Sequence, residues 1–340
     1  MGVNLTDIVE RRTCELREFS GKVIAIDAYN ALYQFLATIR QRDGTPLMDS
    51  HGRITSHLSG LFYRTANLIE LGIKPVYVFD GAPVRLKLAE IEERREAKQK
   101  AMDEWKEALK AGDLEEAKSK AQATAKLTRE MVEDSKRVLD GLGVPWLDAP
   151  HDGEAQASHM AAKGDAYAAA SQDYDSLLFG ASRLVRNVTM SGRRKLPMRD
   201  VYVDVKPELV ALDEALKALG LTRVQLVDVG ILIGTDFNEG MTGIGPKKAV
   251  KLIKEYGSIE KARVKDMPIA VENLDELRML FLEPEVRDDY KIEFGPPEPG
   301  KVIAFLCDSR EFGRERVDAT LQRVMKSIDS QKQRTLDRFF

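Results

Sequence analysis

The chain has 340 residues, of which 43% are hydrophobic and 31% charged, and its formal net charge is −3. This composition is typical of a globular protein, and no apolar run approaches the ~18 residues of a membrane span, so we expect no membrane partner. The negative charge argues against nucleic-acid binding unless acids and bases are segregated along the chain. The two cysteines and four histidines match no zinc or disulfide spacing.

The N-terminal region, residues 1–83, is predicted to begin an α/β fold. KVIAID predicts a strand that ends on Asp27, followed by a helix over about 28–39 and a turn-rich loop over 40–53. Apolar residues at helical spacing predict a second helix over about 56–71. The apolar run KPVYVFD then predicts a buried strand that ends on Asp80, before a Gly-Ala-Pro turn.

From residue 84 to about 139 the composition changes to Glu, Lys, Arg, Ala and Gln, with one break at Ala111-Gly112-Asp113. Glycine can end one helix and aspartate can cap the next, so this segment predicts a long helical hairpin. Its sparse apolar stripe indicates that most of it lies outside the core. We expect residues 84–140 to form an insertion.

The alternation of strands and helices resumes in residues 141–236. We expect a strand in VPWLDAP, a helix over about 154–163 and a small-residue strand in AYAAAS. A hairpin with a basic tip, Arg193-Arg194-Lys195, is expected over 182–205. From about residue 206 the pattern is mainly helical. We expect a helical region over 237–325 and a polar tether with an apolar end over 326–340.

Strands that alternate with helices predict a largely parallel, twisted sheet covered by helices on both faces. Such sheets bind ligands beyond the carboxyl ends of their strands. Acidic residues follow the predicted strands there, and each i, i+2 pair would point to one side of an extended segment. The candidate site therefore contains seven carboxylates: Asp27, Asp80, Asp152, Glu154, Asp173, Asp175 and Asp236.

Carboxylates crowded at one rim repel one another, and their pKa values rise unless cations neutralise them. Oxygen ligands without histidine or cysteine favour Mg²⁺ or Mn²⁺ over zinc. Two such ions about 4 Å apart suit in-line attack on a phosphodiester. For a single aspartate, a helix N-cap or turn residue is the better interpretation, but five clusters at strand ends favour a metal site.

Several motifs recur in order over nearly the whole chain: AIDAYNALYQFL, TSHLSGLFYRT, GIKPVYVFDG, DAPHDGEAQAS, SQDYDSLLFG and ILIGTDFN followed by GIGPKKA. With them the chain resembles the flap endonuclease family of structure-specific 5′ nucleases, and the archaeal type most. The resemblance implies a PIN-like nuclease core, in which the seven acids bind two Mg²⁺ ions and Mn²⁺ can substitute. Where the family usually has Glu, this chain has Asp152.

The same resemblance implies that the helical hairpin is an arch over the active site, through which a single-stranded 5′ end passes. Lys87 and Arg94 match catalytic bases at its foot; seven residues apart, they share one helix face. Further positions match DNA contacts of the family: Gly2 near the terminus, Tyr33 as a stacking ring, Arg40 and Arg64 on phosphates, and Thr55 in the loop that receives a one-nucleotide 3′ flap. For Tyr33, a core tyrosine is an equally good interpretation of the sequence.

GIGPKKAVKLIKEYG resembles the helix–two-turn–helix element of the family. Gly243 and Gly245 would let backbone N–H groups approach a phosphate, and Lys247 and Lys248 begin a row of lysines along the duplex. The resemblance also implies a monovalent cation, K⁺, at this loop. A simple turn at a helix start is the alternative interpretation of the two glycines.

QRTLDRFF at the C-terminus matches the clamp-binding box of Gln333, Leu336, Phe339 and Phe340. Two phenylalanines after a polar tether have no core of their own, so we expect them to bind the sliding clamp, PCNA. Docking back on the chain is the alternative. The tail ends at the box, without the basic extension of eukaryotic relatives, which favours the archaeal type.

The sequence thus predicts a monomeric, Mg²⁺-dependent 5′ flap endonuclease with 5′→3′ exonuclease activity. Its expected roles are Okazaki-fragment processing and DNA repair. It would be cytoplasmic and nucleoid-associated in an archaeal-type cell, or nuclear in a eukaryote. Three alternatives stay open: a related nuclease for bubbles or Holliday junctions, a catalytically silent clamp-tethered adaptor, and a Mg²⁺ phosphatase on a similar sheet.

Overall fold

The structure is a computed structural model that describes residues 2–190, 193–195, 202–265 and 267–336. For residues 87–91, 93–95, 193–195, 202–204 and 332–336 it describes the backbone alone. Across these ranges, no helix combines the length and apolarity that crossing a bilayer requires.

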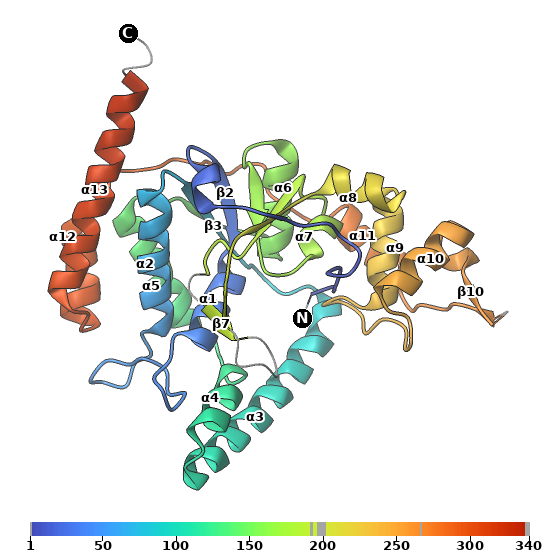
Figure 1. Cartoon of the computed structure of the whole chain (residues 1–340), viewed down its shortest axis with the longest axis horizontal. Helices are drawn as coiled ribbons and strands as arrows, with labels where there is room; N and C mark the ends of the chain where they lie inside the picture. The colour runs from blue at the N-terminus through green and yellow to red at the C-terminus, as the bar shows by residue number, and fades with distance from the viewer. Residues whose placement is uncertain (1, 191–192, 196–201, 266, 337–340) are drawn as a thin grey trace.

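A central sheet organises the fold (Figure 1). In the described ranges its strand order is β1–β9–β6–β5–β2–β3–β4. The bounds are β1 Arg12–Thr13, β9 Glu208–Ala211, β6 Arg183–Arg186, β5 Ala168–Ala170, β2 Val23–Asp27, β3 Lys74–Phe79 and β4 Trp146–Asp148. Strands β6, β5, β2, β3 and β4 pair in parallel, and β9 and β1 add an antiparallel edge. The predicted mostly parallel sheet is confirmed.

Helices cover both faces of the sheet because side chains alternate along its buried strands. Ile24 and Ile26 of β2 belong to one core, and Ala25 between them belongs to another. The first face packs on α1 Ala28–Thr38, α2 Ser56–Glu70, α5 Arg129–Leu142, α12 Pro299–Ile303 and α13 Arg314–Leu336. The second packs on α6 Gly153–Lys163, and a neighbouring core gathers α7 Asp175–Leu178, α8 Leu212–Leu219 and α9 Arg223–Ile233.

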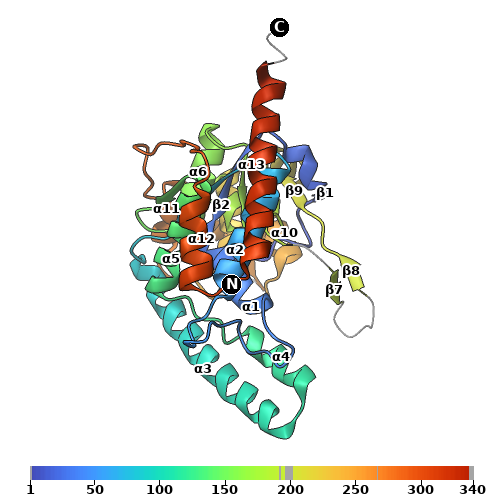
Figure 2. The same cartoon turned by 90° about the vertical axis from the view of Figure 1, so that its left-hand side faces the viewer.

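The helical hairpin projects from the body of the molecule as a separate limb (Figures 1 and 2). It consists of a short 3₁₀ turn, Arg85–Lys87, then α3 Leu88–Ala111 and α4 Leu114–Gln122. As predicted, Gly112 turns the chain with φ +74°, and Asp113 caps α4 by accepting a hydrogen bond from the N–H of Glu116 at 2.9 Å.

The hairpin is shorter than the sequence suggests. Helix α5, which we assigned to the insertion, packs against α2 in the core. Its apolar residues repeat at helical spacing and are buried, among them Val132, Val138, Leu139 and Leu142. Only α3 and α4 therefore form the limb, which we call the arch.

The arch rests on the loop between α1 and α2. The indole Nε1 of Trp105 in α3 donates a hydrogen bond to the carbonyl oxygen of Asp43 at 3.2 Å. Next to it, Gly44 has φ +85°, and a Cβ there would lie 2.6 Å from the Cβ of Ala121 in α4. The backbone of the loop is thus in close contact with both arch helices.

The remaining elements surround the sheet. After α9 come α10 Pro246–Tyr256, a 3₁₀ turn Ile259–Lys261, the short pair β10 Arg263–Val264 and β11 Met267–Pro268, and α11 Leu274–Leu282. Near the N-terminus a 3₁₀ turn spans Leu16–Phe19. Strands β7 Arg193–Lys195 and β8 Tyr202–Asp204 pair antiparallel, as the predicted hairpin requires.

The expected tether is largely helical. A π-helical segment, Ala304–Ser309, leads to α13, which continues through Leu336. Helix α13 lies along α2 because Ser327 and Gln331 donate hydrogen bonds to the carbonyl oxygen of Ile69 at 3.4 Å and 3.2 Å. The first residues of the predicted polar tether, up to Leu336, are thus helical, and two of their polar side chains bond the carbonyl oxygen at the end of α2.

Candidate active site

The carboxyl ends of β2 and β3 bring two acids to the same edge of the sheet. Asp27 is the last residue of β2 and also the N-cap of α1, accepting a hydrogen bond from the N–H of Asn30 at 2.9 Å. Asp80 follows β3 directly, and its Oδ1 accepts from the N–H of Gly153 at 2.8 Å. Asp27 is thus a helix cap, and its metal-binding role stays a prediction.

Asp152 and Glu154 lie at the start of α6. Asp152 is the N-cap, accepting hydrogen bonds from the N–H groups of Glu154 and Ala155 at 2.9 and 3.1 Å. Glu154 is buried, and its Oε1 accepts from the N–H of Ser176 at 2.8 Å. The expectation that the i, i+2 pair lies on an extended segment was wrong, because the helix begins at Gly153.

Asp173 and Asp175 follow β5 in a bend that opens α7. Oδ2 of Asp173 accepts from the side-chain amide of Asn30 at 2.9 Å, which links this pair to the Asp27 helix. Asp175 is 3% exposed and is the first residue of α7. Here too a helix start replaces the extended segment that we expected.

Asp236 lies in a turn after helix α9, so it does not follow a strand as the sequence suggested. The turn is held by Thr235 and Asn238, whose side chains hydrogen-bond each other at 2.9 Å. Its carboxylate nevertheless acts on Asp175 electrostatically, so the turn delivers Asp236 to the same cluster.

Burial and mutual repulsion change the acidity of this cluster. Burial raises the pKa of Glu154 well above its ordinary value, and four neighbouring carboxylates add to the effect: Asp175, Asp173, Asp27 and Asp152. Burial also raises the pKa of Asp175 to about 8, with Asp236 as the next cause. The negative charge of Asp80 contributes to raising the pKa of Tyr29 to about 12, after burial. Six of the acids thus act on one another electrostatically, namely Asp27, Asp152, Glu154, Asp173, Asp175 and Asp236. Asp80 acts on Tyr29 together with Asp27.

The donor set fits hard divalent cations. It consists of carboxylate oxygens, without an imidazole or a thiolate among the seven. In the described part of the chain, no three acidic, histidine or cysteine side chains are gathered tightly enough to hold an ion by themselves. Mg²⁺ keeps several of its waters and takes one or two carboxylates directly, so a looser group of acids suits it.

The arch foot stands next to this cluster. Tyr33 of α1 lies beneath the arch, where Nζ of Lys98 in α3 is 4.5 Å from the centre of its ring. Lys87 ends the 3₁₀ turn and Arg94 lies in the first turns of α3, but their side chains lie outside the described residues. Their predicted role at the scissile phosphate stays a prediction.

Three other predicted DNA contacts near the N-terminus, Arg40, Thr55 and Arg64, have structural surroundings that the structure describes, and their DNA contacts stay predictions. Arg40 donates from Nε to the carbonyl oxygen of Leu36 at 2.8 Å and from a terminal guanidinium nitrogen to that of Gly44 at 2.9 Å. Thr55 is buried at the N-cap of α2. Arg64 is half-buried in α2, and burial lowers its pKa.

The lysines of α10 are exposed on one side of an amphipathic helix. Ala249, Leu252 and Ile253 face the core, while Lys247, Lys248, Lys251 and Lys254 face solvent. Gly245 is the N-cap, and a Cβ at Gly243 or Gly245 would meet no atom within 4 Å. The positive φ of +77° explains Gly243, and the backbone before α10 is open to a ligand.

The predicted clamp box is described only in part. Gln333 and Leu336 lie in the last turns of α13 with their side chains outside the described residues, and Phe339 and Phe340 lie outside the described residues altogether. The clamp interaction stays a prediction.

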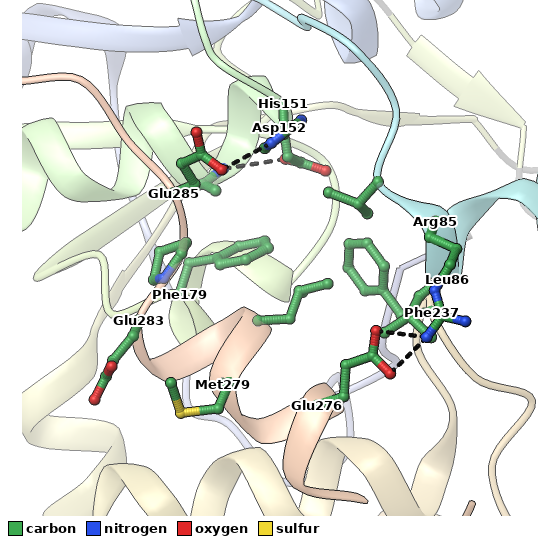
Figure 3. Close-up of a pocket in the computed structure, with 14 residues that line it drawn as sticks. Arg85, Leu86, His151, Asp152, Phe179, Phe237, Glu276, Met279, Glu283 and Glu285 are labelled. Atoms are coloured by element: carbon green, nitrogen blue, oxygen red, sulfur yellow. Dashed lines mark hydrogen bonds and ion pairs between the residues drawn. The ribbon is translucent and has the colours of Figure 1, made fainter. Parts of the chain in front are cut away.

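A cavity of about 280 Å³ opens beside Asp152, between the arch foot and α11 (Figure 3). Its floor is apolar, with Phe179 and Phe237, and its rim carries His151 and Glu285. We did not identify His151 or Glu285 from the sequence. In the sequence, His151 could have been noticed because it precedes Asp152, a predicted metal ligand. Glu285 could not, because it lies 134 residues from His151 in the sequence.

Comparison with known proteins shows the family to which the chain belongs. Residues 1–101 match the model of the XPG N-terminal domain, and residues 143–236 match that of the XPG I-region. Flap endonuclease 1 of Archaeoglobus fulgidus is 53% identical over 340 residues, covering 100% of both chains. The chain belongs to the flap endonuclease family. Flap endonuclease 1 of Pyrococcus abyssi is likewise 53% identical, over 100% of this chain and 98% of its own.

Two solved structures share the fold of this chain. Flap endonuclease-1 from Methanococcus jannaschii superposes with a TM-score of 0.76 at 40% identity, covering 97% of this chain and 100% of that one. The catalytic core of Rad2 in complex with a DNA substrate shares the fold, with a TM-score of 0.72 at 22% identity and coverage of 95% and 100%. The first family model ends within α3, so that the last part of α3 and all of α4 lie between the two models.

Proposed function

We propose that this protein is a structure-specific 5′ flap endonuclease with 5′→3′ exonuclease activity that hydrolyses a phosphodiester at the base of a 5′ flap. The observation that supports the proposal is the electrostatic coupling of six carboxylates from distant segments, with Asp80 hydrogen-bonded to Gly153 beside them, next to the foot of an arch. Membership of the flap endonuclease family supports the substrate, since relatives at 53% identity are flap endonucleases 1.

Asp27, Asp80, Asp152, Glu154, Asp173, Asp175 and Asp236 would hold two Mg²⁺ ions, for which Mn²⁺ can substitute. Bound there, the ions would supply a nucleophilic water and stabilise the leaving oxygen. The carboxylates themselves orient this chemistry, since hydrogen bonds from Gly153, Asn30 and Ser176 fix three of them. Lys87 and Arg94 at the arch foot would stabilise negative charge on the scissile phosphate.

Further residues would bind the branched DNA. Tyr33 would stack on a base near the cleavage site, and Arg40, Arg64, Thr55 and Gly2 would contact the strands around it. The element from Gly243 to Lys248 would hold a duplex phosphate, with K⁺ at the same loop. The proposed acidic site and the basic row on α10 are segregated, which reconciles the net charge of −3 with a DNA partner.

The same proposal assigns the biological setting. The enzyme would act as a monomer on replication and repair intermediates, including Okazaki fragments. Its C-terminal Gln333, Leu336, Phe339 and Phe340 would bind the sliding clamp PCNA. The organisms of the relatives favour a cytoplasmic, nucleoid-associated enzyme.

Cleavage assays on labelled DNA test this function. A double-flap substrate with Mg²⁺ should be cut at the flap base, and EDTA should abolish the reaction. Bubble and four-way-junction substrates serve as controls. Cleavage of these two alone would instead identify a junction or bubble nuclease, and binding without hydrolysis would identify an adaptor.

A further inference from the structure

Two loops that carry candidate metal ligands are in direct backbone contact. The first, residues 80–82, starts with Asp80 and leads to the arch; the second, residues 149–153, contains Asp152. Gly81 donates from its N–H to the carbonyl oxygen of His151 at 2.7 Å. Gly153 donates in return to Oδ1 of Asp80 at 2.8 Å. We call these two segments the ligand loops.

The contact between the ligand loops is too close for a side chain. A Cβ at Gly81 would lie 2.2 Å from the carbonyl oxygen of Ala149 and 2.3 Å from that of Pro150. Such distances require backbone to move, so glycine is needed at residue 81 for this approach. At Gly81, the distance between the two ligand loops is therefore set by direct backbone contact with Ala149 and Pro150.

The imidazole of His151 bridges three segments. Nδ1 lies 2.7 Å from the carbonyl oxygen of Ala82, and Nε2 lies 3.0 Å from a carboxylate oxygen of Glu285 (Figure 3). The carbonyl oxygen of Ala82 only accepts hydrogen bonds, so Nδ1 donates there, and the protonated ring donates to Glu285 from Nε2 as well. Glu285 lies in the segment between α11 and α12, residues 283–298, which we call the connector. The His151 ring thus joins both ligand loops to the connector.

We propose that His151 is a positioning residue of the active site, which fixes the Asp152 segment against the Asp80 segment and the start of the arch. The hydrogen bond to Ala82 is the essential one, because Ala82 belongs to the ligand loop that enters the arch. The bond to Glu285 orients the ring. The inference rests on the proposed nuclease function for its catalytic readout.

The two bonds can be removed separately. His151→Asn keeps an amide donor near the place of Nδ1, whereas His151→Gln keeps one near the place of Nε2. His151→Ala removes both, and Glu285→Ala removes only the carboxylate. His159→Ala is the matched control, since His159 on α6 makes a similar 3.0 Å contact to Asp288 of the same connector, away from the ligand loops.

Single-turnover cleavage of the double-flap DNA, at constant pH and saturating Mg²⁺, gives the catalytic readout. His151→Ala and His151→Gln should lower the rate about tenfold or more, as expected when a partner that orients metal ligands is lost. His151→Asn and Glu285→Ala should stay within about threefold of the parent, because the Ala82 bond persists. The affinity for flap DNA in Ca²⁺ should remain unchanged in all four variants.

Two readouts do not require turnover. Amide hydrogen exchange should accelerate at Gly81 and Gly153 in His151→Ala and His151→Gln, but not in His151→Asn or His159→Ala. Calorimetric titration of the DNA-free protein with Mn²⁺ should show affinity weakened about tenfold in the first two variants alone. If the parent protein cuts no flap, the function fails, while exchange and Mn²⁺ titration still decide the role of His151.

Three results would overturn the inference. His151→Ala could retain the parental rate, Mn²⁺ affinity and exchange pattern. His151→Gln could restore all of them while His151→Asn does not, which would make Glu285 the essential partner. Finally, His159→Ala could match the losses of His151→Ala, which would reduce the effect to general loosening of the connector.

Discussion

The backbone N–H of Val3 donates a hydrogen bond to Oδ1 of Asp175 at 2.8 Å, across 172 residues of sequence. This bond ties the start of the chain to the most buried aspartate of the acid cluster. The residue before it, Gly2, is wedged against the same cluster, because a Cβ there would lie 2.7 Å from the Cβ of Asp173 and 2.9 Å from Oδ2 of Asp175.

Gly2→Val should therefore lower flap cleavage about tenfold or more, since the added side chain must displace Asp173 or Asp175. The global unfolding temperature should change less than the rate, because the buried side chains of Val3 and Leu5 keep the terminus anchored in the core. Single-turnover rates and a thermal melt check this. Gly313→Ala is the control, as a Cβ at Gly313 meets no atom within 4 Å. An unchanged rate in Gly2→Val would show that the terminus moves aside during catalysis.

Lys87→Ala and Arg94→Ala should each lower the single-turnover rate by about a hundredfold while leaving DNA affinity nearly unchanged. The reason is that a cation aimed at developing charge acts on the transition state more than on the bound substrate. Rates with Mg²⁺ and binding with Ca²⁺ separate the two effects. Lys110→Ala, at the end of α3 far along the arch, serves as the control. A loss of affinity that equals the loss of rate would assign both residues to plain DNA binding.

Tyr33→Leu should reduce the cleavage rate by roughly ten- to a hundredfold, corresponding to the ~1–3 kcal/mol that base stacking contributes. Tyr33→Phe keeps the ring and should remain near the parental rate. The comparison also tests the alternative interpretation of Tyr33 as a core residue. Equal stability of both variants with a rate loss in Tyr33→Leu alone favours stacking, and loss of stability in Tyr33→Leu with normal cleavage contradicts it.

His57 should make the fold sensitive to mild acid. It is 1% exposed, neither ring nitrogen has a hydrogen-bond partner among the described residues, and burial, helped by Arg310, lowers its pKa to about 3. The unfolded chain has the ordinary histidine pKa of about 6.5, so it binds the extra proton first as the pH falls. Stability from neutral His57 is thus complete above about pH 6.5 and is lost progressively toward pH 3.

The free energy of unfolding should consequently fall by about 2 kcal/mol between pH 7 and pH 5 because of this residue alone. Urea unfolding at both values measures it. His57→Phe should remove that part of the pH dependence, and His51→Ala, at an exposed histidine, should not. Identical pH dependence in the parent and His57→Phe would mean that the folded protein admits a proton at this site.

Removal of residues 333–340 should spare cleavage of oligonucleotide flaps and abolish stimulation by the sliding clamp. The structure supports the first part, because the last described contacts of α13 with the core come from Ser327 and Gln331. Phe339→Ala with Phe340→Ala, in the full-length chain, is the finer variant. Loss of basal cleavage on truncation would indicate that the tail packs on the nuclease itself.

The sheet could be predicted because its chemistry is local. The apolar runs before Asp27 and Asp80 form parallel strands, and the alternation of Ile24, Ala25 and Ile26 divides two cores as strand geometry demands. That the acids after β2, β3, β4 and β5 lie on one side of the sheet also follows from topology, since parallel strands end at one edge.

Other features depend on tertiary contacts that no local pattern shows. Helix α5 reads as a continuation of the polar hairpin until α2 covers its apolar side. Asp236 reaches the cluster from a turn after a helix, which sequence periodicity cannot align with strand ends. The partners of His151 are separated from it by 69 and 134 residues, so only the folded chain brings them together.

The contact of Gly44 with Ala121 packs the arch against the loop between α1 and α2. Because the positive φ and the close approach both demand glycine, the tilt of α3 and α4 depends on the smallest possible side chain at one loop position. Swinging the arch outward must separate this backbone contact and the bond from Trp105 to Asp43 together. An outward movement of the arch is therefore coupled to the conformation of this loop through these two contacts.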